Sequence, residues 1–175
     1  MVNYPKQHFI FELKHQCNFA ITAYSELNIA ISNQNADKIW SSLELFLIAA
    51  AKISIIFWPQ EKKYNERGED LRNLLKVDEN VVYKKTDPRN HLQHFDQRLE
   101  DWYAKSTHHN LADSNIFPET NFMTGNVDYL RIFLTRRRVF KFEDKEYDIV
   151  PIYDSIVELL TEVDKEYENI TGQIH

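Results

Sequence analysis

Arg89, Asn90 and His94 are the residues of this chain whose types and spacing best suit chemistry on a phosphate. They lie in the stretch Thr-Asp-Pro-Arg-Asn-His-Leu-Gln-His-Phe, residues 86–95. A guanidinium can bind an anionic oxygen, an amide can orient a neighbouring group, and an imidazole can carry a proton near neutral pH. Together the three side chains provide what phosphodiester cleavage needs: a proton carrier and a donor for the negative charge that develops on the phosphoryl group.

The sequence around these residues predicts a helix from Pro88 to about Lys105. Asp87 is a favourable N-cap residue and proline is favourable at the first helical position. At about 100° per residue, His94 and Asn90 fall opposite an apolar stripe. An anion near the helix start would also meet its free N–H groups. The stripe consists of Leu92, Phe95, Leu99, Trp102 and Tyr103.

The segment Arg89-Asn90-His91-Leu92-Gln93-His94 resembles the R-x4-6-H signature of the HEPN superfamily. The resemblance implies a helical bundle and, as in many members, a metal-independent endoribonuclease, related to toxins or phage defence. It also implies a homodimer whose two motifs face each other. Catalysis would use Arg89 to bind the phosphate, His94 as base or acid, and Asn90 to orient either group. No cofactor and no metal would be needed.

One position departs from the pattern of some members of that family. They carry a tyrosine two residues after the motif histidine, where a partner nucleotidyltransferase adds AMP. Here that position is Asp96, so control by tyrosine modification is not expected. An antitoxin of another kind, or another protein partner, remains open.

The elements that must hold the motif are mostly helical. Apolar residues spaced by three and four predict helices, and their approximate ranges are 5–33, 36–58, 66–76, 88–105 and 151 onward. The second is apolar on most sides and is expected to be the most buried. No linker divides the chain, so we expect a single domain over residues 1–175.

A small β element is expected before the last helix. Residues 106–128 show no sustained period and are expected to form a long loop. Residues 129–134 and 139–142 are two short, mainly apolar runs and predict a β-hairpin with its bend at 135–138. The predicted fold class is therefore mainly α: an antiparallel, HEPN-like helical bundle with a small β-hairpin over about 129–142.

The charge distribution leaves room for RNA binding. The chain has a net charge of -6, but ten acidic and two basic residues fall between Glu143 and Glu168. The remainder is slightly positive, which permits a local basic patch. The candidate substrate-binding residues are Lys84, Lys85, Arg136, Arg137 and Arg138.

Cysteine usage and hydropathy favour a cytoplasmic protein. The chain has one cysteine, Cys17, which cannot form an internal disulfide and is expected to be a small core residue. The apolar stretch from Leu43 to Trp58 contains Glu44 and Lys52 and is shorter than the ~20 residues that a membrane span needs. We therefore expect a core helix and no membrane association.

Other interpretations of the motif stay open. An exposed polar helix face is usually only solvated, and a catalytic face would need the shielding that a homodimer provides. A non-catalytic HEPN-like protein that binds a partner protein or a nucleotide is the main alternative. A histidine metal site formed by His91, His94, His108 and His109 is a weaker one, and His91 is more simply a packed structural residue. A DNA-binding regulator ranks below these, because no helix resembles a basic recognition element.

Overall fold

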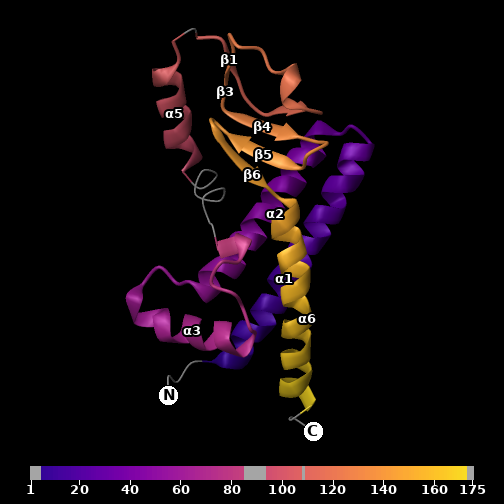
Figure 1. Cartoon of the computed structure of the whole chain (residues 1–175), viewed down its shortest axis with the longest axis vertical. Helices are drawn as coiled ribbons and strands as arrows, with labels where there is room; N and C mark the ends of the chain where they lie inside the picture. The colour runs from indigo at the N-terminus through magenta and orange to yellow at the C-terminus, as the bar shows by residue number, and fades with distance from the viewer. Residues whose placement is uncertain (1–4, 85–93, 108, 173–175) are drawn as a thin grey trace.

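The computed structural model describes residues 5–84, 94–107 and 109–172, and its framework is a pair of long antiparallel helices, α1 and α2 (Figure 1). α1 spans Lys6–Ser32 and α2 spans Ala36–Phe57. The side chain of Asn35 caps α2 by accepting a hydrogen bond from the backbone N–H of Lys38 at 3.1 Å, which satisfies one of the free donors at a helix start. The two long helices predicted from the sequence are thereby confirmed to within one residue at each end.

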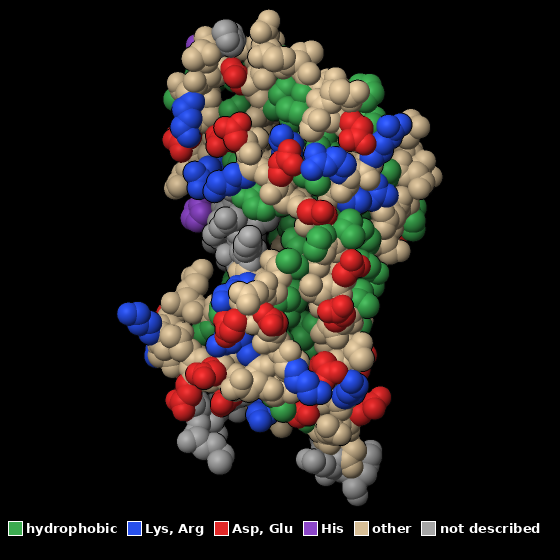
Figure 2. Space-filling view, in the orientation of Figure 1, with side chains coloured by type: hydrophobic (Ala, Val, Ile, Leu, Met, Phe, Trp, Pro, Cys, Tyr) green, Lys and Arg blue, Asp and Glu red, His purple; other side chains and the backbone are tan. Residues whose placement is uncertain are grey.

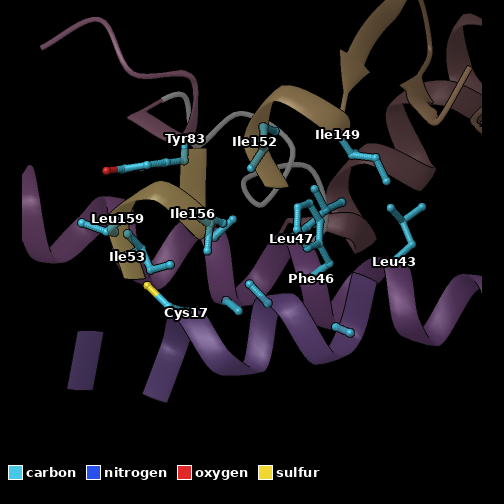
Figure 3. Close-up of a cluster of buried hydrophobic side chains, with 14 of the residues drawn as sticks. Cys17, Leu43, Phe46, Leu47, Ile53, Tyr83, Ile149, Ile152, Ile156 and Leu159 are labelled. Atoms are coloured by element: carbon cyan, nitrogen blue, oxygen red, sulfur yellow. The ribbon is translucent and has the colours of Figure 1, made fainter. Parts of the chain in front are cut away.

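The third long helix is α6, Val150–Gly172, which runs from the sheet along the length of the molecule and packs against α1 (Figure 1). Tyr24 of α1 and Tyr153 of α6 stack with their ring centroids 4.0 Å apart, and Lys14 forms an ion pair with Asp164. Buried side chains of α1, α2 and α6 form one core (Figure 3). Cys17 is completely buried in it, as the sequence predicts.

α2 is the one helix in the described part of the chain that is long and apolar enough to cross a membrane. However, 56% of its most apolar window is buried inside the protein. Phe46, Ile53 and Phe57 are fully buried, so the helix fills the core of this fold. Length and composition alone are weak evidence for a membrane span.

A smaller helical part packs on the C-terminal end of α2. It contains the 3₁₀ turn Lys62–Tyr64, the helix α3 at Asn65–Leu74, and the 3₁₀ turn η2 at Val82–Lys84. Gly68 allows the close approach, since a Cβ there would lie 2.4 Å from the carbonyl oxygen of Phe57. In Figure 1 this part lies at the opposite end of the molecule from the sheet.

The β part is larger than a hairpin. Its strands are β1 Leu111–Ala112, β2 Asn115–Phe117, β3 Asp128–Tyr129, β4 Arg131–Leu134, β5 Val139–Phe142 and β6 Lys145–Asp148. The predicted hairpin is confirmed as β4 and β5, which pair antiparallel, with Phe133 opposite Phe140. β2 adds in parallel to β4 and β6 adds antiparallel to β5, while β1 and β3 form a separate parallel pair. The sequence missed β1, β2 and β3 because two or three residues are too few to show a pattern. It missed β6 because Lys-Glu-Tyr-Asp is mostly polar and exposed.

The sheet shares the helical core. Phe133, Phe140 and Phe142 are fully buried among the core side chains of the helices. On the other side Ile132, Leu134 and Val139 form a second small cluster, which Phe117, Met123 and Tyr129 cover. The molecule is thus mainly helical, with a small sheet before the last helix.

The remaining helix, α5, spans Phe95–Lys105 and lies beside the sheet (Figure 1). His94 is its N-cap residue, with φ -107° and ψ 36°, so it stands just before the helix. The sequence predicted that His94 would lie within a helix that begins at Pro88. This prediction is wrong for His94, because the helix that ends at Lys105 begins at Phe95 and His94 precedes it. Pro88 itself lies outside the described residues.

Candidate functional site

His94 is the one predicted catalytic residue that the structure describes. Its side chain is exposed and makes no capping hydrogen bond, while its carbonyl oxygen accepts a hydrogen bond from the N–H of Arg98 at 3.1 Å. Arg89 and Asn90 lie outside the described residues. His94 is therefore accessible to a ligand at the start of α5, where the first-turn N–H groups have no helical partner.

The ring of Phe95, the residue after His94, packs against the guanidinium of Arg131. The guanidinium carbon of Arg131 lies 4.3 Å from the centroid of the Phe95 ring and 5.5 Å from that of Trp40. The Arg131 side chain is only 14% exposed. A cation between two aromatic rings and shielded from water gives a stronger interaction than one on an open surface. This contact joins the start of α5 to β4 and α2.

Arg131 is itself fixed by acidic partners. Its Nε and Nη2 donate to the two carboxylate oxygens of Asp113 at 2.9 and 2.5 Å, and Nη2 also donates to Ser114 Oγ at 2.8 Å. Its Nη1 lies 3.4 Å from Glu44 Oε1. Burial alone would raise the pKa of Asp113, but the hydrogen bonds and charge of Arg131 outweigh it, and the pKa is lowered. The bidentate geometry makes this a specific and rigid pair.

Trp40, whose ring contacts the Arg131 guanidinium, forms a further link to the same loop. Trp40 Nε1 donates to the carbonyl oxygen of Ser114 at 3.0 Å. The loop between β1 and β2 is therefore tied to α2 by both Arg131 and Trp40. We call Trp40, Glu44, Phe95, Asp113 and Arg131 the Arg131 junction. No local pattern in the sequence could reveal it, since Arg131 lies 18 residues from Asp113 and 87 from Glu44.

On the other side of the predicted motif, the chain is anchored to α2 at Lys84. Ser54 Oγ donates to the carbonyl oxygen of Lys84 at 3.2 Å. The preceding Tyr83 is 3% exposed, and its burial raises its pKa. Ser54 and Glu44 are ten residues apart on one helix, which corresponds to about 15 Å. The chain is thus tied to α2 on both sides of residues 85–93, directly at Lys84 and, through the Arg131 junction, at Phe95.

Lys84, a predicted RNA-binding residue, is engaged within the protein. Its Nζ lies 2.8 Å from Glu79 Oε2 and 5.1 Å from the centroid of the Trp58 ring. Hydrogen bonds from Lys84 and Trp58 lower the pKa of Glu79 to about 2. Lys84 is therefore already paired with a carboxylate, and Lys85 lies outside the described residues.

The arginine triplet divides into three different environments. Arg138 donates from Nε and Nη2 to Asn28 Oδ1 at 3.1 and 3.0 Å, which ties the hairpin bend to α1. Arg137 pairs with Glu146 at 3.1 Å. Arg136 is exposed, lines a surface hollow beside Pro118, and has no ion pair with any described residue. Of the triplet, Arg136 has the charge most available to a ligand.

The described residues do not form a histidine metal site. No group of three His, Cys, Asp or Glu side chains that could hold a metal ion occurs among them. His94 and His109 flank opposite ends of α5, whose 11 residues span about 16 Å, so these two cannot share one ion. His91 and His108 lie outside the described residues.

Charge on the face drawn in Figure 2 is mixed. Lys and Arg side chains alternate with Asp and Glu side chains around the sheet and α5, and acidic residues lie along α6. Any binding of RNA on this face would therefore depend on individual cations and not on a broad basic field.

Comparison with known proteins gives no match: no family model, no curated protein and no solved structure is similar to this chain.

Proposed function

We propose that this protein is a HEPN-type endoribonuclease that cleaves RNA without a metal, with Arg89, Asn90 and His94 as its catalytic residues. The observation that carries the proposal is the exposed His94 at the start of α5, next to a residue clamped by Arg131. Catalysis needs a group that is accessible to substrate yet rigidly positioned. The order Arg89, Asn90, His94 in the sequence supplies the partners.

The proposed reaction is an internal phosphoryl transfer. A base takes the proton of the ribose 2′-OH, the 2′ oxygen bonds to phosphorus, and the bond from phosphorus to the 5′ oxygen breaks. A proton is then delivered to the leaving 5′ oxygen. The products are a 2′,3′-cyclic phosphate and a 5′-OH, so no water is consumed in this step and no metal is required.

The roles follow from the chemistry of each side chain. His94 exchanges the proton, as imidazole can near neutral pH. Arg89 keeps its charge and stabilises the phosphoryl oxygens as their negative charge grows. Asn90 orients the imidazole or the phosphate. Asp96 is exposed in the first turn of α5 and would repel an anion bound there, so the proposal depends on Arg89 to offset its charge.

The test is RNA cleavage by the purified protein, with and without EDTA, by wild type and by His94→Ala. His109→Ala is the matched control, because His109 is an exposed histidine at the other end of the same helix. Loss of a general acid or base typically lowers the rate about 10²- to 10⁴-fold. We expect that loss in His94→Ala, full activity in His109→Ala, and no effect of EDTA. Undiminished cleavage by folded His94→Ala would contradict the proposal.

The alternative is a non-catalytic protein that binds a partner protein or a nucleotide, and the acidic surface of α6 favours it. Part of that acidity is neutralised internally, since Glu162 pairs with Lys76 and Lys165, and Asp164 pairs with Lys14. If the protein leaves RNA intact over a range of pH and still binds a defined partner, this alternative replaces the nuclease.

A further inference from the structure

An apolar groove of about 600 Å³ runs along the seam between α1 and α2. Phe19, Leu45 and Ile48 line it and are 59%, 61% and 42% exposed. Ala23 and Ala49 form part of its floor. Three large apolar side chains that share one groove are unusual on the surface of a monomer and mark an interaction surface.

The rims of this groove carry opposite charges. On α1, Glu12, Phe19 and Glu26 are spaced by seven residues, which places them on one face of the helix. All three are exposed. Phe19 and Glu26 line the groove, and Glu12 lies just beyond its end, where it accepts a hydrogen bond from the lining residue Gln16. The α1 side is therefore acidic at both ends with an aromatic ring between.

On α2 the same spacing gives the opposite charge. Lys38, Leu45 and Lys52 are also seven residues apart and exposed. Neither lysine forms an ion pair with any residue that the structure describes, and the same is true of Glu26. The groove thus has an acidic rim, a basic rim and an apolar floor.

We propose that this groove binds a second copy of the chain, with α1 of each copy lying over α2 of the other. A two-fold axis parallel to the seam brings each acidic rim onto the partner's basic rim and places Phe19 and Leu45 of the two copies together. A two-fold axis across the seam would instead set α1 against α1, with acid facing acid and lysine facing lysine. The charge pattern therefore selects the first arrangement.

The size of the surface fits this occupant. α2 has 22 residues, so it presents a face about 33 Å long, and two helices side by side are about 20 Å wide. The area of this face is on the order of the ~800 Å² that each partner buries in a stable complex. This interface contains no residue of α5, so it is not the interface at which the two motifs of a HEPN-type dimer would face each other. The groove dimer and the nuclease activity can therefore fail independently.

The test is the mass of the purified full chain in solution across the micromolar range, measured by sedimentation and light scattering. Wild type is expected to have twice the 20.9 kDa of one chain. Glu12→Lys/Glu26→Lys makes both rims basic, and Lys38→Glu/Lys52→Glu makes both acidic. Each variant alone is expected to be monomeric, with dimerisation weakened about 100-fold or more by like charges.

Mixing the two variants provides the decisive measurement. In a mixed dimer every acidic rim again faces a basic rim, so the equimolar mixture is expected to regain the dimer mass. Lys62→Glu/Lys145→Glu, which reverses two exposed lysines away from the groove, is the matched control and is expected to remain dimeric. Circular dichroism confirms that each variant is folded.

Three outcomes would overturn the proposal. Wild type could be monomeric throughout this range, either variant alone could dimerise as well as wild type, or the mixture could stay monomeric. A monomer that instead captures an amphipathic helix of another protein in this groove would assign the surface to that partner and would equally overturn it.

Discussion

The guanidinium carbon of Arg131 lies 4.3 Å from the centroid of the Phe95 ring, while the same guanidinium is held by both oxygens of Asp113. A residue of β4 thereby contacts the first residue of α5. Because Phe95 directly follows His94, the position of the imidazole depends on an ion pair formed elsewhere in the fold.

Replacing Arg131 with methionine tests this dependence. Arg131→Met removes the charge but keeps much of the side-chain length, and leaves Asp113 half-buried without its cation. We expect a loss of about 1 to 3 kcal/mol in the free energy of unfolding, measured with urea. RNA cleavage is expected to fall as well, because Phe95 loses its contact.

Two comparisons make this result specific. Arg137→Met removes an exposed pair and is expected to change stability by less than about 0.5 kcal/mol. Arg131→Met combined with Asp113→Asn is expected to cost less than the sum of the single changes, since the residues act together. If the two changes in the free energy of unfolding simply add, the interaction between Arg131 and Asp113 contributes little to stability.

Arg136 and Arg138 are expected to differ although they are two residues apart. Arg138→Ala should lower the free energy of unfolding by about 1 to 2 kcal/mol, because Asn28 loses its donor. Arg136→Ala should leave stability unchanged. If Arg136 contacts a phosphate, its loss should also weaken RNA binding. The slope of the logarithm of the binding constant against the logarithm of the salt concentration should then become shallower by about one. Equal loss of stability in both variants would contradict the different roles.

Glu79 should make stability depend on pH in the acidic range. Its pKa is lowered from 4.5 to about 2 by hydrogen bonds from Lys84 and Trp58. Stabilisation by Glu79 is therefore fully present above about pH 4.5 and is lost as the pH falls toward 2. The free energies of unfolding of wild type and Glu79→Gln should differ at pH 7 and become equal near pH 2. A difference that does not change with pH would exclude this ionisation as its cause.

Cys17 should be inert to thiol reagents in the folded protein. Burial raises the pKa of its thiol to about 12 and excludes solvent, so almost no thiolate is present at neutral pH. Ellman's reagent is expected to react with it only after unfolding in guanidinium chloride. Rapid reaction in native buffer would mean that the core around α1 opens readily.

The sequence predicted the helices well because their signal is local. α1, α2 and α6 each bury a face that repeats every three or four residues over more than 20 residues, which is long enough to define the period. The hairpin of β4 and β5 was predicted from two short, mainly apolar runs separated by four residues. β1 and β3 have two residues each, and no period can be seen in two residues.

The candidate site was predictable only in part. Arg89, Asn90 and His94 stand close together in the sequence, so their residue types alone suggest them. The Arg131 junction joins α2, α5, β4 and the loop at Asp113, and it exists only once those elements are packed. The environment of Arg138 was missed for the same reason, because Asn28 is 110 residues away. Glu79 is only five residues from Lys84, but the two do not share a helix, so no regular spacing predicts that their side chains meet.

The packing of α6 against α1 has a consequence for synthesis of the chain. Lys14 and Asp164 are 150 residues apart, and Ile156, Leu159 and Val163 of α6 complete the core that α1 and α2 begin. Contacts between such distant segments form slowly. While the ribosome is still making the intervening residues, the apolar side chains of α1 and α2 that await α6 stay uncovered. During this interval the nascent protein is most vulnerable to aggregation and most dependent on chaperones.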